Sequence, residues 1–259
     1  MHKAIGHRTA QNSSHVNLIA VIPAYQEQAM VGAVVRQARR FADDVIVVDD
    51  GSTDGTADLA KRSGAVVVRH HCNLGKGTAL RTGFVEALKM NPIIVVTLDA
   101  DGQHLPYQIP LLARPIMNGD ADIVVGTRML QHNGMPISRI LSNKISTTLI
   151  RMITDTGSTS LTDSQCGFRA FSARTAPIVL KTHSERFNVE AETLMLARIA
   201  GLRIREVPVA CVYRAHAKSE IVASREIRLF AKLLLQFLFR RTLQRSATEH
   251  VIRSLTRSS

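Results

Sequence analysis

Residues 95–104 read Val95-Val96-Thr97-Leu98-Asp99-Ala100-Asp101-Gly102-Gln103-His104, an apolar, β-branched segment that leads straight into two carboxylates. Because alternate residues of a strand project to the same side, we expect Asp99 and Asp101 to converge where a buried strand emerges into solvent. Two converging carboxylates repel each other unless a cation or proton lies between them. A hard divalent ion, completed by substrate phosphates, would meet that need. The stretch therefore predicts a metal-assisted nucleotide site.

A second stretch upstream repeats the pattern. The apolar residues 45–48 are followed by Asp49, Asp50 and a Gly-containing turn over residues 51–56. An Asp-x-Asp pair alone is more typical of turns and helix N-caps than of metal sites. Two apolar strands that each deliver acids at their carboxyl ends, however, match the crevice where open α/β sheets bind ligands.

Strand and helix patterns alternate along the first half of the chain. The expected strands lie at residues 18–23, 45–48, 65–69, 92–98 and 123–126, with helices at about 31–38, 57–63 and 79–90 between them, and a later strand at 207–213. This order predicts an α/β fold with a mostly parallel sheet and helices on both faces.

The composition narrows the functional classes. The chain has 259 residues, of which 45% are hydrophobic, and a formal net charge of +12. Such a charge favours an anionic partner. Only 4% of residues are aromatic and Trp is absent, so a base-stacking platform for nucleic acid is poorly supported. The three cysteines have no metal-ligand spacing and indicate a reducing compartment. No apolar run reaches the about 18 residues of a membrane span, so we expect any membrane contact to be peripheral.

A Gly-rich segment lies between the third and fourth strands, Asn73-Leu74-Gly75-Lys76-Gly77-Thr78. Two glycines around a lysine at a helix start would let the backbone approach a phosphate while Lys76 supplies charge. The alternative is an ordinary helix entry with a solvated lysine. The spacing is not that of a P-loop.

Six motifs fall in the order seen in one family. They are Ile22-Pro23-Ala24-Tyr25-Gln26-Glu27, Val48-Asp49-Asp50-Gly51-Ser52-Thr53-Asp54, Asn73-Leu74-Gly75-Lys76-Gly77, Asp99-Ala100-Asp101-Gly102-Gln103-His104, Gly126-Thr127-Arg128 and Asp163-Ser164-Gln165-Cys166-Gly167-Phe168-Arg169. The chain resembles the family-2 glycosyltransferases, and among them dolichol-phosphate mannose synthase and its polyprenyl-phosphate relatives. The resemblance implies a GT-A (Rossmann-like) fold and an inverting transfer of a sugar from GDP-mannose or a UDP-sugar to a polyprenyl or dolichyl phosphate.

The resemblance also implies a donor site. Its nucleotide-sugar ligands would be Pro23, Tyr25, Glu27, Val48, Asp50, Lys76, Asp99, Ala100, Asp101, Arg128, Arg214 and Lys218, with Asp50 reading the base. Mg²⁺ or Mn²⁺ would be held against the diphosphate by Asp99, Asp101 and Gln103. A bound metal would neutralise the charge that builds on the departing diphosphate.

The acceptor phosphate is already anionic and needs little help from a general base. We therefore expect arginines to position it, namely Arg128, Arg139 and Arg169, because guanidinium forks suit phosphate geometry. Asp101, Arg128 and Asp163 form the predicted catalytic group. Asp163 would orient Arg169, and the alternative is a direct catalytic role. The sequence Lys218-Ser219-Glu220 departs from the family's usual serine-then-lysine order and puts Lys218 in doubt.

The ends of the chain carry different signals. Residues 1–17 are expected to form a loose tail, 18–223 the catalytic domain, and 224–259 a basic amphipathic helical tail. That helix would meet an anionic membrane surface on the cytoplasmic side, or pack on the core or on a second subunit of a homo-oligomer. A family member with a soluble or polysaccharide acceptor, and a non-enzymatic nucleic-acid binder, are the alternatives to a lipid-phosphate glycosyltransferase.

Overall fold

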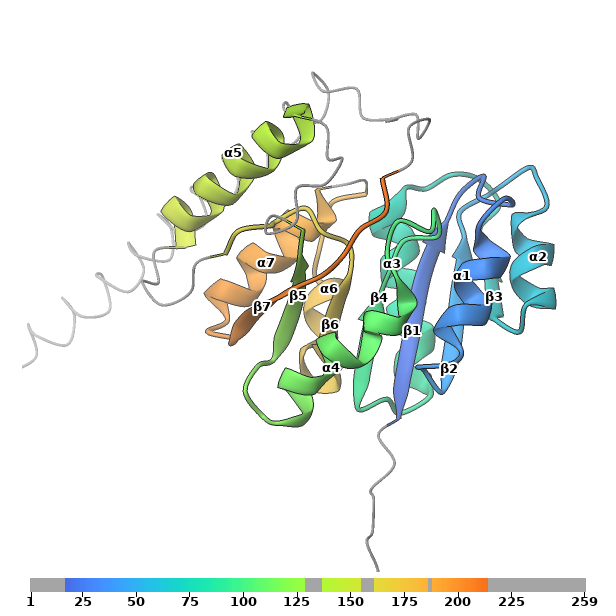
Figure 1. Cartoon of the computed structure of the whole chain (residues 1–259), viewed down its shortest axis with the longest axis horizontal. Helices are drawn as coiled ribbons and strands as arrows, with labels where there is room; N and C mark the ends of the chain where they lie inside the picture. Colours follow the sequence, from blue (N-terminus) through green and yellow to red (C-terminus); the bar gives the residue numbers. More distant parts are fainter. Residues whose placement is uncertain (1–16, 129–136, 155–160, 186–187, 214–259) are drawn as a thin grey trace, which may run out of the picture.

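The computed structural model describes residues 17–128, 137–154, 161–185 and 188–213. Its centre is a seven-stranded sheet in the order β3-β2-β1-β4-β6-β5-β7, with helices on both faces (Figure 1). The strands are β1 (Leu18–Ala24), β2 (Asp44–Asp49), β3 (Val66–Arg69), β4 (Ile94–Thr97), β5 (Ile123–Thr127), β6 (Arg169–Ser172) and β7 (Ile204–Pro208). The helices are α1 (Val31–Ala38), α2 (Thr56–Arg62), α3 (Lys76–Lys89), α4 (Ile109–Met117), α5 (Ile137–Thr154), α6 (Pro177–Leu180) and α7 (Val189–Ile199), with 3₁₀ turns η1 (Pro106–Gln108) and η2 (Ala173–Thr175).

The central strands form the core of the molecule. The side chains of β4 are all buried, as are nearly all of those in β1 and β2, which explains their almost continuous apolar sequences. The chain runs from β1 outward to β3 and then returns to place β4 on the other side of β1. The carboxyl ends of β1 and β4 therefore flank the point where the strand order reverses, which is where such sheets bind ligands.

The predicted α/β fold with a mostly parallel sheet is confirmed. All strand pairs are parallel except those of β6, which is antiparallel to both β4 and β5. The sequence did not predict β6, because a four-residue strand beside the glycine turn at residues 166–168 gives almost no periodic signal. The later strand was predicted at residues 207–213, whereas β7 ends at Pro208 and only an isolated bridge joins Cys211 to His104.

Strand alternation does not bring Asp99 and Asp101 together, contrary to the prediction. Strand β4 ends at Thr97, and Ala100, Asp101 and Gly102 lie in a turn. Gly102 adopts a φ of +72°, a backbone conformation that favours glycine. Asp99 and Asp101 thus both lie beyond the carboxyl end of β4, but a turn rather than an extended strand brings them there.

An ion-pair cluster lies at the amino end of β5, the end away from the predicted site. Asp122 accepts hydrogen bonds from the backbone N–H of Arg203 at 2.9 Å and from its guanidinium at 3.0 and 3.1 Å, and it also pairs with Arg174. These hydrogen bonds hold the pKa of Asp122 well below its ordinary value, and the bonds from the Arg203 side chain have the largest effect. The cluster ties the start of β5 to the segment that enters β7, away from the predicted site.

The predicted amphipathic tail at 224–259 lies outside the described residues, as do residues 1–16 of the predicted N-terminal tail. Asn17 already belongs to the folded body, since its side chain donates to the carbonyl of Met90 at 2.8 Å. Among the helices in the described part of the chain, none combines the length and apolar character needed to cross a membrane.

Candidate active site

Asp49 and Asp50 organise the loops beyond β2. The Asp50 carboxylate accepts from His70 Nδ1 at 2.7 Å, from the Leu74 N–H at 3.0 Å and from the Gly75 N–H at 2.7 Å. Asp49 accepts from the Ser52 N–H at 3.1 Å, and its other oxygen pairs with Arg69. Asp50 is therefore the residue that fixes the Gly-rich segment next to the predicted donor pocket. Its reading of the base stays a prediction.

Lys76 lies between two carboxylates. Its Nζ is 2.6 Å from Asp99 Oδ1 and 2.7 Å from Glu190 Oε1, so this cluster joins the start of α3, the end of β4 and the first turn of α7. Burial alone would raise the pKa of Asp99, but the charge of Lys76 and its hydrogen bond outweigh burial and lower the pKa to about 2. Gly167 makes room for the cluster, because a Cβ there would lie 2.9 Å from both Lys76 Nζ and Asp99 Oδ2.

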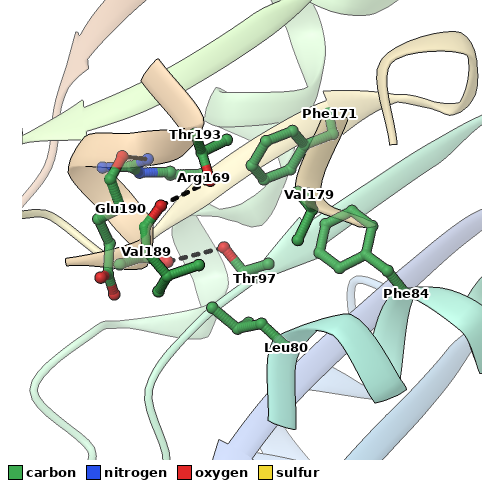
Figure 2. Close-up of a pocket in the computed structure, with 10 residues that line it drawn as sticks. Leu80, Phe84, Thr97, Arg169, Phe171, Val179, Val189, Glu190 and Thr193 are labelled. Atoms are coloured by element: carbon green, nitrogen blue, oxygen red, sulfur yellow. Dashed lines mark hydrogen bonds between the residues drawn. The ribbon is translucent and has the colours of Figure 1, made fainter. Parts of the chain in front are cut away.

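Glu190 is a site residue that the sequence did not reveal. Its side chain is buried, and Oε2 has no hydrogen-bond partner among the described residues. Figure 2 shows Glu190 and Arg169 on the polar side of a small pocket whose other side is apolar, with Leu80, Phe84 and Phe171. A lone glutamate on a helix gives no sequence signal, so only the fold shows that Glu190 faces Lys76.

Gly77, in the Gly-rich segment, makes a close backbone approach to segment 184–185, and the approach of a phosphate to this segment stays a prediction. The Gly77 N–H donates to the carbonyl of Glu185 at 2.7 Å. A Cβ on Gly77 would lie only 2.0 Å from the carbonyl oxygen of Ser184. Segment 184–185 therefore covers the start of α3, and glycine is needed at residue 77 for that reason.

The turn at residues 99–104 is stabilised from inside. Asp101 Oδ1 accepts from the Gln103 N–H at 2.9 Å, and the Asp99 N–H donates to His104 Nδ1 at 3.2 Å. Burial lowers the pKa of His104 to about 4, although the charge of Asp99 opposes this shift. The imidazole is therefore neutral at neutral pH, with its proton on Nε2. Its ring stacks on the ring of Phe168, with 5.2 Å between the two ring centroids.

Arg128 and Asp163 form a two-pronged ion pair beyond the end of β5. Arg128 Nε and Nη2 donate to the two carboxylate oxygens at 2.8 and 2.9 Å, and the Arg128 N–H also donates to Oδ2 at 3.1 Å. Burial alone would raise the pKa of Asp163, but the hydrogen bonds and charge of Arg128 lower it. Asp163 thus orients Arg128, not Arg169 as predicted.

Arg169 is a structural residue in this fold. Its buried guanidinium donates to the carbonyls of Cys166 and Glu190 at 2.7 Å and of Ser164 at 2.8 Å. Because Arg169 is 2% exposed and its guanidinium is bonded to three backbone carbonyls, the predicted contact with an acceptor phosphate is not supported.

The other predicted ligands are distributed as follows. Pro23 and Glu27 are partly exposed, Tyr25 is exposed, and Val48 and Ala100 are buried. Gln103 is partly exposed next to Asp101. Arg139 lies in the first turns of α5, but its side chain is not described, and Arg214 and Lys218 lie outside the described residues. The structure therefore brings together Lys76, Asp99 and Glu190 at one point and Arg128 and Asp163 at another, on the same edge of the sheet.

Comparison with known proteins identifies the family. The sequence model of Glycosyl transferase family 2 matches residues 19–175, a range that covers the strands from β1 to β6 except Leu18, the first residue of β1. The chain belongs to this family. It is a glycosyltransferase, and its sheet is that of the GT-A fold.

Two relatives of this glycosyltransferase carry informative names. The UDP-N-acetylglucosamine–dolichyl-phosphate N-acetylglucosaminyltransferase of Methanococcus voltae is 31% identical, over 76% of this chain and 86% of that protein. The undecaprenyl-phosphate mannosyltransferase of Micrococcus luteus is also 31% identical, over 80% of this chain and 88% of that protein. A solved structure of glucosyl-3-phosphoglycerate synthase from Mycobacterium tuberculosis, in complex with Mn²⁺, UDP and glucosyl-3-phosphoglycerate, shares the fold. Its TM-score is 0.64 with 22% identity, over 87% of this chain and 80% of that one.

Proposed function

We propose that this glycosyltransferase moves a sugar from a nucleoside diphosphate sugar to a polyprenyl or dolichyl phosphate, with Mg²⁺ or Mn²⁺ as the cofactor. Two relatives that are 31% identical are named for transfer to lipid phosphates of this class. The observation that carries the proposal is that the carboxylates beyond β4 and the Arg128–Asp163 pair beyond β5 lie at one edge of the sheet. One end of such a site suits a metal-bound diphosphate and the other a second phosphate.

The donor end fits a hard divalent ion that the substrate helps to coordinate. The described residues contain no group of three His, Cys, Asp or Glu side chains that could hold a metal by themselves. Mg²⁺ commonly uses one or two carboxylates and completes its shell with substrate phosphates, and Asp101 and Gln103, with Asp99, offer such oxygens. When bound, the metal would neutralise charge on the departing diphosphate. The structure of glucosyl-3-phosphoglycerate synthase, which shares the fold, contains Mn²⁺ together with UDP, and this supports a divalent metal ion as the cofactor here.

The chain's own residues would do the rest by positioning. Lys76 holds Asp99 in a fixed orientation, and the neutral His104 accepts the Asp99 N–H and so supports the turn that carries Asp101. Asp163 engages Nε and Nη2 of Arg128 but not Nη1, which keeps donors for an acceptor phosphate oxygen. That oxygen is already anionic, so we expect direct attack on the sugar with inversion and no general base.

A transfer assay tests the proposal. The purified chain is supplied with radiolabelled UDP-N-acetylglucosamine, UDP-glucose or GDP-mannose, together with a short polyprenyl phosphate, with Mn²⁺, with Mg²⁺ or with excess chelator. The expected result is a labelled, organic-soluble product with one donor, formed only when a divalent ion is present. Binding of a donor without any transfer to lipid phosphate, combined with transfer to a soluble phosphate such as phosphoglycerate, would contradict the proposed acceptor.

A further inference from the structure

Helix α5 buries a polar face. Among its side chains that the structure describes, the buried ones are Asn143, Ser146, Thr147 and Ile150, at the spacing of one helical face. Three of these four are polar. A buried polar group destabilises the fold unless it is hydrogen-bonded. This face of α5 must therefore pack against a segment that offers hydrogen-bond partners rather than against an apolar surface.

The partner is the segment that carries Asp163. Asn143 Oδ1 accepts from the Ser164 N–H at 3.1 Å, and Asn143 Nδ2 donates to the Thr162 carbonyl at 3.4 Å. The Thr147 and Ser146 hydroxyls lie 3.0 and 2.9 Å from Ser164 Oγ. The Asn143 amide therefore holds the backbone on both sides of Asp163.

Strand β7 holds the same segment through a second set of hydrogen bonds. Glu206 accepts from the N–H groups of Thr162 and Asp163, both at 2.8 Å. Asp163 in turn accepts two hydrogen bonds from the Arg128 guanidinium and one from the Arg128 N–H, so Asn143 and Glu206 both act on Arg128 through Asp163. Arg139, a proposed acceptor ligand, lies four residues before Asn143, one turn away on α5.

We propose that Asn143 is a positioning residue that couples α5 to the Asp163–Arg128 pair, so that use of the acceptor phosphate depends on the docking of α5. This inference rests on the proposed function for the role of Arg128. It assigns to α5 a task beyond carrying the predicted acceptor ligand Arg139: the helix also sets the orientation of Arg128.

Kinetics of Asn143→Asp test the coupling. The variant is almost isosteric, but it replaces the donor that faces the Thr162 carbonyl with an oxygen. We expect the acceptor KM to rise about tenfold while the dissociation constant of the nucleotide sugar changes much less. Thr148→Ala, an exposed position on the same helix, is the matched control and should match the parent. Combined with Arg128→Lys, the effect of Asn143→Asp should be much smaller than alone, because both act through the same arginine. Fully additive effects would overturn the inference.

Hydrogen exchange gives a readout that does not depend on the acceptor. The Ser164 amide should be protected in the parent and exchange faster in Asn143→Leu, which removes the oxygen that accepts this N–H. It should also exchange faster in Thr147→Val, which keeps the side-chain shape but loses the hydroxyl that accepts the same N–H at 3.2 Å. Unchanged protection of Ser164 in both variants would refute the coupling, whatever the acceptor is. Faster exchange in an enzyme that transfers no sugar to lipid phosphate would instead refute the proposed acceptor and leave the coupling in place.

Discussion

Lys76 Nζ lies 2.6 Å from Asp99 Oδ1, and this ion pair joins the Gly-rich start of α3 to the carboxyl end of β4. Glu190 pairs with the same ammonium group at 2.7 Å. One cation therefore holds two carboxylates from elements that are far apart in sequence. They lie where the diphosphate of a nucleoside diphosphate sugar is expected. The orientation of Asp99 is thus set before any substrate binds.

Replacing Lys76 by Met should weaken both donor binding and stability. The variant keeps most of the length of the side chain but leaves the buried Glu190 and the partly exposed Asp99 facing each other without a cation. We expect a loss of about 3 kcal/mol in the free energy of unfolding, measured by urea denaturation, and a higher donor KM. The double variant Lys76→Met/Glu190→Gln should recover part of the stability, because one of the stranded charges is gone. A double variant that is less stable than the single one would contradict this account of the cluster.

Asp101→Asn should remove most of the transfer activity and the metal dependence of nucleotide binding, because the proposed metal loses a charged oxygen ligand. The side chain is partly exposed, so the melting temperature should stay close to that of the parent. Isothermal titration calorimetry with UDP or GDP, with and without Mn²⁺, measures the metal dependence of nucleotide binding. Asp58→Asn, at an exposed position on α2, is the control for loss of one surface charge. Undiminished metal-dependent binding in Asp101→Asn would remove Asp101 from the metal site.

Asp50→Asn should raise the donor KM more than Asp49→Asn does. Asp50 is the predicted base reader, and its carboxylate accepts the N–H groups of Leu74 and Gly75 beside the pocket. Loss of a charge-assisted hydrogen bond should cost about 1.5–3 kcal/mol of donor binding. Steady-state kinetics with one donor at a time compares the two variants. The reverse order of effects would show that Asp49 faces the base.

The Asp122 cluster predicts how stability responds to acid. Because the folded-state pKa of Asp122 is depressed, its ion pairs stabilise the fold above the ordinary aspartate pKa of about 4 and lose that contribution as the pH falls below it. Asp122→Asn should therefore lower the melting temperature at pH 7, and the difference from the parent should shrink toward pH 3. Activity per folded molecule should be unchanged, since the cluster lies at the other end of β5. A difference in melting temperature that is the same at both pH values would contradict the electrostatic explanation.

The sequence predicted the features that follow from local pattern. Continuous apolar runs such as those of β2 and β4 can only be satisfied by burial on both faces, so the parallel sheet followed directly from them. Acids directly after such runs had to lie at the carboxyl edge, and so Asp50 and Asp99 could be placed there without any coordinates. Strand β6 could not be predicted, since four residues carry too little periodicity to distinguish a strand from a turn.

The partners of the site residues were decided by the tertiary structure alone. Asp163 was expected beside Arg169, its neighbour in sequence, yet it pairs with Arg128, because the antiparallel insertion of β6 turns Arg169 into the interior and brings residue 163 to the end of β5. Glu190 and Asn143 gave no signal at all in the sequence, because each acts on a residue far away along the chain. Residue type and local pattern determine where a strand ends and which charges it presents, whereas the pairing of those charges depends on which elements the fold packs against one another.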